Sequence, residues 1–402
     1  MPPGARRAGL GYLLYAGALA WLACSLEPER LSSLRFGPLG TVQLPTRMSL
    51  LGWSALALGS GLWGLRGALS PRRRALLLGL HALGLVCSIL LWASMQQRLE
   101  VLGLLAQSCR LATPILLGAL AGLLSERSGI VNIGLEGMML AAACLGFTAA
   151  LYTASPWLGV GVAALVGGAM AAGHAVLAIH GQVNHIISST VLNIFAVGFT
   201  GFVRRTVLLH STQSAPAVLP TWPVPLLSDL PVLGQIFFRH QPLVYVTWCL
   251  VILIEIILRY TPWGLRTRAI GEQPRAAETM GVPVVTMQYM NVIAGGMLAG
   301  LGGAWFSLET VGTFDDMMTG GKGFIALAAM IFGQWTPWGA LQGALVFGFV
   351  DALQIKLQIA GLKIPYQVLS MSPYVVTMVL LVGFIGKAVP PGAAGQPSTR
   401  SL

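Results

Sequence analysis

Residues 118–140, GALAGLLSERSGIVNIGLEGMML, place charged and amide side chains inside a strongly apolar run. The polar members are Glu126, Arg127, Asn132 and Glu136. A charged side chain in hydrocarbon costs about 3 kcal/mol even on lenient insertion scales, so such residues usually face a bundle interior or a solute path. Glycines also interrupt the run, and a broken membrane helix is tolerated only where its freed backbone groups meet protein or a water-lined cavity. The stretch therefore predicts a discontinuous membrane helix beside a solute path.

The composition of the whole chain agrees with this prediction. Of its 402 residues, 55% are hydrophobic and 9% are charged, whereas soluble domains carry about 25% charged residues. The net charge of +11 arises from basic residues that lie mostly in short links between apolar runs, where they set membrane orientation, so no nucleic-acid partner is expected. The five cysteines have no paired spacing and predict neither a disulfide framework nor a metal site.

The apolar runs predict an all-α polytopic membrane protein with about 10–12 transmembrane helices, some of them broken or re-entrant. A span across roughly 30 Å of hydrocarbon needs about 20 residues. The run 324–333 is too short for this and predicts a half-helix, joined through 334–337 to the next helix. The predicted spans are 9–26, 48–65, 75–95, 102–124, 136–154, 157–179, 185–203, 243–259, 288–308, 338–355 and 372–387.

Basic residues in the short links predict the orientation of the chain. Arg6 and Arg7 precede the first span, and 72–74 are arginines between the second and third, so both segments and the N-terminus should be cytoplasmic. This arrangement places the link 204–242 outside, where Arg204 and Arg205 fit the rule poorly. The first run lacks a clear cleavage site and predicts an uncleaved anchor. Residues 389–402 are rich in Pro, Gly, Ser and Ala and predict a disordered tail.

The link 260–287, YTPWGLRTRAIGEQPRAAETMGVPVVTM, is the longest polar segment on the predicted inner side. Residues 276–278 predict a short helix that ends at 281–283. Such a helix is suited to receive force from a soluble partner. Composition alone favours the simpler interpretation, an amphipathic helix that marks the membrane interface.

Part of this link has a more specific pattern, G-x-x-x-R-A-I-G-E-x-x-x-A-A-x-x-x-G-V, which begins at Gly264. It resembles the cytoplasmic coupling loop of ABC importer permeases of the simple-sugar and nucleoside group. Residues 125–140 resemble the signature of the nucleoside branch, the basic-membrane-protein type of uptake system, and 323–348 are similar to the late-helix pattern. The resemblance implies an ABC importer permease fold for 101–388. It implies ATPase coupling by Arg268, Gly271, Glu272, Ala276, Ala277 and Gly281.

The resemblance also implies what the chain works with. The expected partners are an ABC ATPase subunit, a second permease subunit, identical or different, an extracytoplasmic solute-binding lipoprotein and the lipid bilayer, here the bacterial inner membrane. Gly320-Gly321-Lys322-Gly323 lacks the spacing and the hydroxyl residue of a phosphate-binding loop. We therefore expect the chain to be a transport subunit, not an enzyme, with no cofactor of its own, while the ATPase chain uses ATP-Mg. The resemblance does not extend to residues 1–100, whose three predicted spans would form either an added packing layer or a partner-binding element.

Two residues of the opening stretch are the first candidates for the solute path. If 130–140 is helical, Asn132 and Glu136 share one face. An amide beside a carboxylate could then hold ribose hydroxyls or a purine edge. Alternatively, Glu136 pairs with Arg127 or bonds a neighbouring helix.

Two further candidates lie later in the chain. Asn193 matches an Asn of the family motif, and either a path-wall contact or inter-helix hydrogen bonding would explain it. Phe306 could stack on a base, although an interfacial aromatic belt explains its neighbour Trp305 equally well. Asp315 and Asp316 predict either a docking surface for a binding protein or a solvated turn.

The function that these features favour is a nucleoside permease that forms half of a translocation pore. Within the same class, a simple-sugar or branched-chain amino-acid permease is the alternative. An ion-coupled secondary transporter would also use broken helices and a buried Glu136. A membrane scaffold without transport is the remaining interpretation.

Overall fold

The computed structural model describes residues 3–27, 31–65, 71–95, 99–212, 218–359, 367, 371 and 389–396. The chain divides into two compact units. Unit 1 comprises Met1–Leu105, Leu230–Ile236 and Leu353–Ser370, and unit 2 comprises Ala106–Asp229, Phe237–Ala352 and Met371–Leu402. Two helices, α4 (Val101–Arg127) and α14 (Pro337–Ile359), have residues in both units, and the larger part of each belongs to unit 2.

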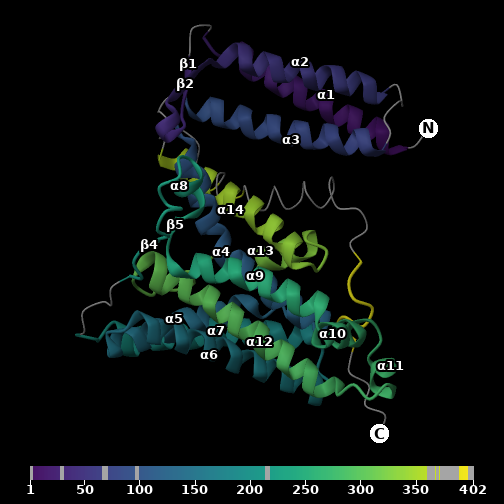
Figure 1. Ribbon diagram of the computed structural model, residues 1–402, viewed down its shortest axis with the longest axis vertical. Coiled ribbons are helices and arrows are strands. Elements are labelled where there is room, and N and C mark those ends of the chain that lie inside the picture. The colour runs from purple at the N-terminus through teal and green to yellow at the C-terminus, as the bar shows by residue number, and fades with distance from the viewer. Residues whose placement is uncertain are drawn as a thin grey trace. The chain divides into compact units, whose positions relative to one another are not determined.

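Unit 1 contains three long helices and a small sheet. Its helices lie side by side (Figure 1), and the strands join in the order β2-β1-β3, with β1 antiparallel to β2 and parallel to β3. The elements are α1 (Pro3–Cys24), β1 (Leu31–Arg35), η1 (Gly37–Leu39), β2 (Thr41–Pro45), α2 (Thr46–Leu65), α3 (Pro71–Ala93), β3 (Leu99–Glu100) and α8 (Leu233–Phe237), whose last residue is assigned to unit 2.

Glycine and small polar groups set the packing in unit 1. A Cβ added to Gly9 would lie 2.9 Å from the carbonyl oxygen of Gly61, so α1 and α2 approach at backbone distance. His81 of α3 is buried, contacts the Ser60 hydroxyl at 2.9 Å and stacks on Tyr12 with ring centroids 4.3 Å apart. These contacts hold the three helices of residues 1–100 to one another.

Unit 2 contains the remaining elements. Its helices are α5 (Leu135–Thr153), α6 (Pro156–Ala175), α7 (His185–Val203), α9 (Pro242–Tyr260), α10 (Pro262–Glu272), α11 (Pro274–Thr279), α12 (Val284–Ala304) and α13 (Lys322–Phe332). Three π-helical segments, η2 (Val176–His180), η3 (Arg204–Leu208) and η4 (Trp305–Val311), continue α6, α7 and α12, and a short ribbon pairs β4 (Trp222–Pro223) with β5 (Arg239–His240).

The core of unit 2 forms where α12 packs on α5 and α6. Gly296 and Gly300 of α12 have the GxxxG spacing, and both face α6. A Cβ on Gly296 would lie 2.4 Å from the carbonyl oxygen of Gly167, and one on Gly300 would lie 2.2 Å from that of Ala163. Small residues thus bring the two backbones together, as helix association in lipid requires.

The helices match the predicted membrane spans closely. In the described part of the chain, eight helices are long and apolar enough to cross a membrane. In α1 and α3 the apolar portions, Gly11–Cys24 and Gly79–Trp92, are shorter. The predicted span 372–387 lies outside the described residues. The all-α polytopic fold is therefore confirmed, and so are the discontinuity in 118–140 and the half-helix at 324–333, which appear as the α4–α5 break and α13.

One expectation about the C-terminal tail was wrong for residues 389–396. Instead of disorder, 392–395 form a turn. The Ala393 N–H donates to the carbonyl oxygen of Gly271 at 2.8 Å, and the Gly395 N–H donates to that of Gly129 at 3.1 Å. Glycine, alanine and proline in this segment predict disorder by composition, but here they permit a tight turn whose amides bond the carbonyl groups of two buried glycines.

Candidate functional site

The chain is not helical between α4 and α5, so its backbone groups need other partners. His174 of α6 donates from Nε2 to the carbonyl oxygen of Val131 at 3.0 Å, and its Nδ1 accepts from the Ser188 hydroxyl at 3.0 Å. The Val131 N–H donates to Nδ1 of His185 at 3.3 Å. Both histidines are buried and serve packing in this structure, as inter-helix hydrogen bonding in a membrane bundle predicts.

Asn193 of α7 bonds the segment between α4 and α5 closer to the start of α5. Its Nδ2 donates to the carbonyl oxygen of Ile133 at 3.1 Å, while its Oδ1 accepts from the Gly137 N–H at 2.8 Å. One amide thus joins the end of the break to the first turn of α5. The side chain thus bonds the neighbouring segment, and because it is partly exposed, part of it is also accessible.

The expectation that Asn132 and Glu136 share a helical face is wrong, because α5 begins only at Leu135. Asn132 is fully buried, and its Oδ1 accepts from the Gly134 N–H at 3.0 Å. An asparagine that bonds the backbone two residues on is a typical turn former, and here it starts the helix.

Glu136 binds the N-terminus of the half-helix α13. Its Oε1 accepts from the Thr319 hydroxyl at 2.6 Å and from the Gly321 N–H at 2.8 Å. Its Oε2 accepts from the Gly323 N–H at 2.7 Å. Glu136 also lies in the first turn of α5. A carboxylate is favourable near the positive end of a helix dipole, and this one serves two helices at once.

The other end of α13 is held by the end of α4. Arg127 donates from Nε and Nη2 to the carbonyl oxygen of Trp335, at 2.9 and 2.6 Å. The indole Nε1 of Trp335 donates to Glu126 Oε2 at 2.6 Å. Trp335 has a φ of +51°, so its backbone occupies the left-handed region that an L-residue rarely adopts without such support. The two halves of the interrupted helix therefore clamp α13 at both of its ends.

An intramembrane ion pair adds to this arrangement. Lys322, the first residue of α13, bonds Asp351 of α14, and Asp351 is buried. A lone charge in this position would be costly, and pairing offsets part of that cost. Glu136, Lys322 and Asp351 together form a charged cluster at the start of α13.

The fourth residue predicted for the solute path lies elsewhere. Phe306 belongs to η4, is 7% exposed and packs edge-on against Trp305, with ring centroids 5.0 Å apart. It belongs to the apolar cluster that includes Phe147 and Leu308. The structure thus brings Asn132, Asn193 and Glu136 to one region around the break and keeps Phe306 apart from them.

The link between α9 and α12 contains two helices where the sequence predicted one. The short helix predicted at 276–278 is α11, and Gly281, with a φ of +79°, follows it as expected. The preceding helix α10 is capped by Thr261, whose hydroxyl accepts from the Gly264 N–H at 3.3 Å. The TRAIGE sequence (267–272) forms part of this additional helix, and its apolar residue Ile270 packs against Ala277 and Met287.

The predicted coupling residues fall into two groups. Arg268, Glu272, Ala276 and Gly281 are exposed, whereas Gly271 and Ala277 are buried. A Cβ on Gly271 would lie 2.2 Å from the carbonyl oxygen of Arg127, so the end of α10 touches the end of α4 at backbone distance. The exposed residues form a surface, and the buried glycine connects that surface to the interrupted helix.

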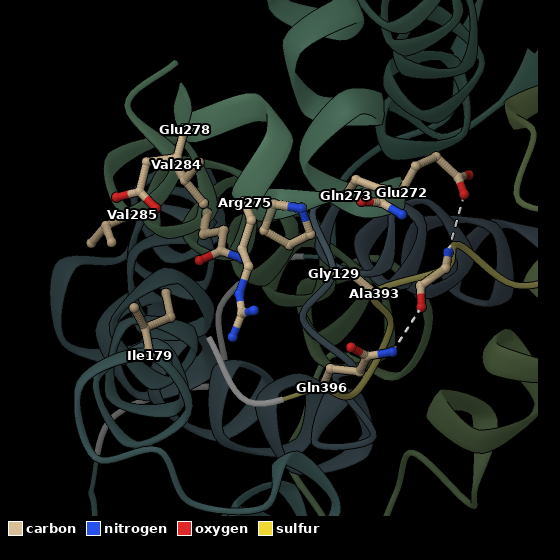
Figure 2. A pocket seen from close by; sticks show the side chains of 13 residues that line it. Gly129, Ile179, Glu272, Gln273, Arg275, Glu278, Val284, Val285, Ala393 and Gln396 are labelled. Carbon is tan, nitrogen blue, oxygen red and sulfur yellow. Dashed lines mark hydrogen bonds between the residues drawn. The ribbon is translucent and has the colours of Figure 1, made fainter. Parts of the chain in front are cut away.

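A cavity of about 670 Å³ lies beside this contact (Figure 2). Polar side chains from α10, α11 and the tail line it, and the Gly392 N–H donates to Glu272 Oε2 at 3.2 Å. Arg275 extends into the cavity from α11, and Gln396 faces it from the tail (Figure 2). The turn at 392–395 thus forms one wall of a hollow whose other wall is the coupling helices.

At the far end of α12, Arg204 has a specific partner. It contacts Asp315 at 2.7 Å and Asp316 at 2.9 Å. The arginine that fitted the orientation rule poorly is therefore paired with two carboxylates, and its charge is balanced locally. These aspartates join the loop after η4 to η3 and are not a purely solvated turn.

Sequence reasoning missed several residues that build the site. Lys322 was considered only against a phosphate-binding loop, and Asp351 was passed over inside the apolar run 338–355. Both are charged residues within apolar sequence, the same signal that singled out Glu136. Trp335 and Thr319 carry no such signal, because their roles depend on where the chain folds back.

An interrupted helix that clamps a half-helix within a multi-pass bundle, with a helical link at one end, defines a membrane transport protein. Residues 104–385 match the family described as branched-chain amino acid transport system / permease component. The chain belongs to this family of permeases.

Three proteins similar to the chain are named as ABC transporter permeases. It is 38% identical over 299 residues to the nucleoside ABC transporter permease protein NupC of Lactococcus lactis subsp. cremoris, covering 72% of this chain and 94% of that protein. It is 40% identical over 302 residues to the guanosine ABC transporter permease protein NupQ of Bacillus subtilis, covering 71% and 93%. A provisionally named glucose ABC transporter permease protein, TsgC13 of Haloferax volcanii, is 38% identical over 299 residues, covering 69% and 90%. No solved structure matches the chain.

Proposed function

We propose that this chain is the transmembrane subunit of an ATP-driven importer of nucleosides and forms half of a translocation pore. The observation that carries the proposal is the 40% identity to a guanosine permease over 302 residues, which span 93% of that protein. The similarity to a nucleoside permease over 299 residues supports the same substrate class. Both alignments have the length of the relatives' whole chains, not of a single motif.

The partners follow from the class of transporter. The pore is completed by a second permease subunit, and a solute-binding lipoprotein delivers the nucleoside from outside the bacterial inner membrane. An ABC ATPase subunit docks on α10 and α11 and uses ATP-Mg, while this chain binds no cofactor. The N-terminus is cytoplasmic. The pairing of Arg204 with Asp315 and Asp316 supports this orientation, since it balances the charge on the outer side.

The solute path runs past the break between α4 and α5. Glu136 and Asn193 are partly exposed and present polar atoms to the path. Asn132 is buried and shapes the wall behind the path, whereas Phe306 is buried in a separate apolar cluster away from the break. In this assignment the carboxylate of Glu136 exchanges its bonds to α13 for bonds to the solute when the path opens.

Movement of the ATPase reaches the path through one backbone contact. The ATPase displaces α10 and α11, and Gly271 transmits that displacement to Arg127 because no side chain separates them. Arg127 holds Trp335 at the end of α13. The coupling residues Arg268, Glu272, Ala276 and Gly281 form the docking surface, and Ala277 fixes α11 on α12.

Reconstituted vesicles containing the complete complex test the proposal. Labelled guanosine should accumulate only with ATP, and unlabelled adenosine should compete more strongly than glucose, ribose or leucine. Glucose is included because TsgC13 is as similar to this chain as NupC is. Accumulation that collapses with an ionophore and persists when the ATPase is inactivated would instead indicate an ion-coupled transporter.

A further inference from the structure

Five buried polar atoms, four on η4 and one on Gln241 before the start of α9, have no hydrogen-bond partner among the residues that the structure describes. They are Nε1 of Trp305, Oγ of Ser307, Oε1 of Glu309, Oγ1 of Thr310 and Oε1 of Gln241. Ser307 and Glu309 are 0% exposed, Trp305 is 2% exposed and Gln241 is 7% exposed. Buried polar groups are normally bonded, so several unpartnered ones in one π-helical segment require an explanation.

Hydrogen bonds that are present place Gln241 directly against η4. Its Nε2 donates to the carbonyl oxygen of Glu309 at 2.5 Å, which leaves its Oε1 without a donor. The Leu243 N–H donates to Glu309 Oε2 at 2.9 Å, so one carboxylate oxygen holds the N-terminus of α9 while the other is unpartnered. Each of these two side chains therefore bonds the backbone through one polar atom and keeps the other polar atom unpartnered.

The π-helical form of η4 brings further groups to the same place. Hydrogen bonds in a π-helix join residues five apart, so Trp305 and Thr310 lie one turn apart. Such segments within α-helices occur frequently at functional sites. The indole is a donor, and the hydroxyl of Thr310 can both donate and accept. Together with the unpartnered oxygens of Gln241 and Glu309, they supply both donors and acceptors.

The charges around η4 indicate the kind of ligand. Arg110 of α4 interacts electrostatically with Glu309 and opposes its negative charge. The region therefore contains charges of both signs. Its combination of an indole N–H, hydroxyls and acceptor oxygens suits an uncharged solute with several hydroxyl groups and ring nitrogens.

We propose that the polar groups of Gln241 and η4 form a nucleoside-binding site at the end of α12 opposite the coupling link. The inference rests on the proposed function and names the residues that contact the solute on its way in. These side chains are buried here, so the site is closed in this conformation. It is connected to the clamp, because the loop after η4 leads to Thr319, whose hydroxyl bonds Glu136 at 2.6 Å.

Two variants that remove unpartnered atoms test the site. Trp305→Phe and Thr310→Val keep most of the apolar volume and delete one polar group each. If these atoms served packing alone, their loss would leave guanosine uptake per folded complex unchanged. The thermal midpoint should stay equal or rise for Thr310→Val, since no hydrogen bond is broken, and should fall for Trp305→Phe, which leaves a cavity in the core. The site predicts the same midpoints together with an apparent KM for guanosine at least five-fold higher.

Thr247→Val is the matched control, because Thr247 is equally buried but its hydroxyl already bonds the carbonyl oxygen of Leu243 at 2.7 Å. It should leave the KM unchanged. Ser307→Ala, the smallest change, replaces Trp305→Phe if that variant is poorly produced. If the wild-type complex takes up guanosine and the η4 variants take it up with the same KM, the η4 site alone is overturned. Absence of guanosine uptake by the wild-type complex overturns the proposed function and the inference with it.

Discussion

Glu136 and Gly323 are 187 residues apart in the chain, yet the Gly323 N–H donates to Glu136 Oε2 at 2.7 Å. A Cβ on Gly323 would lie 2.5 Å from the backbone nitrogen of Glu136, so α5 and α13 begin at backbone contact. Two helix N-termini that meet in this way repel each other unless a negative charge lies between them. The carboxylate of Glu136 supplies that charge, which makes it a structural requirement of the half-helix.

Replacing Glu136 by Gln should loosen the start of α13. The amide keeps one acceptor oxygen but turns an N–H₂ group toward backbone donors, so at least one bond to a charged acceptor is lost, worth about 2 kcal/mol. Hydrogen exchange of the Gly321 and Gly323 amides should become faster, and the thermal midpoint in detergent should fall. Glu255→Gln serves as the control, since Glu255 pairs with Arg259 one turn away on the same helix. Equal exchange in wild type and variant would contradict the role of Glu136.

The contact between Trp335 and Glu126 should show strong coupling in a double-mutant cycle. Trp335→Phe leaves the buried carboxylate of Glu126 without its donor, whereas in a Glu126→Gln background the loss is smaller. We expect an interaction free energy of about 2 kcal/mol, within the range for bonded neighbours. Thermal unfolding of the two single variants and the double variant measures it. Trp338→Phe, on an exposed indole, should show no coupling to Glu126, and additive effects at Trp335 would contradict the clamp.

Gly271→Ala should separate ATP hydrolysis from transport. The added methyl group would lie 2.2 Å from the carbonyl oxygen of Arg127, so α10 must move away from α4. ATPase activity of the complex should remain near that of wild type while uptake falls at least five-fold. Gly198→Ala is the control because a Cβ there meets nothing within 4 Å. Uptake that falls only in proportion to ATPase activity would argue against a transmitting contact.

The tail turn should stabilise the end of α10. Ala393→Pro removes the N–H that donates to the carbonyl oxygen of Gly271, at a cost of about 1 kcal/mol for one neutral hydrogen bond. We expect faster proteolysis within 389–396 and a slightly lower thermal midpoint. Ala394→Ser, one residue on, keeps the N–H that donates to Pro391 and should behave as wild type. Unchanged proteolysis in Ala393→Pro would show that the turn persists without this bond.

Much of the fold could be predicted from the sequence because hydrophobic runs report membrane spans directly. The break at 128–134 and the half-helix α13 were also predictable, since charged residues, glycines and a short run mark them. What could not be predicted is that these two features bind each other. Glu136 was assigned a face shared with Asn132 on the assumption of a continuous helix, but the turn formed by Asn132 delays α5 until Leu135.

The remaining differences arise from contacts between distant segments. The order in 389–396 depends on hydrogen bonds to the carbonyl groups of Gly129 and Gly271. No local sequence pattern indicates these bonds. The role of Trp335 depends on the chain folding back to α4 after α13. Charged residues in apolar sequence were the most informative local signal, and applying it consistently would also have identified Arg110, Glu309 and Asp351.

The most direct test of the account is ATP-driven uptake of labelled guanosine by vesicles that contain the complete complex with wild-type chain or with Glu136→Gln at equal amounts of folded protein. The account predicts ATP-dependent accumulation in wild type and at least a ten-fold lower rate in the variant. Equal rates would contradict the claim that the clamp on α13 is part of the transport path.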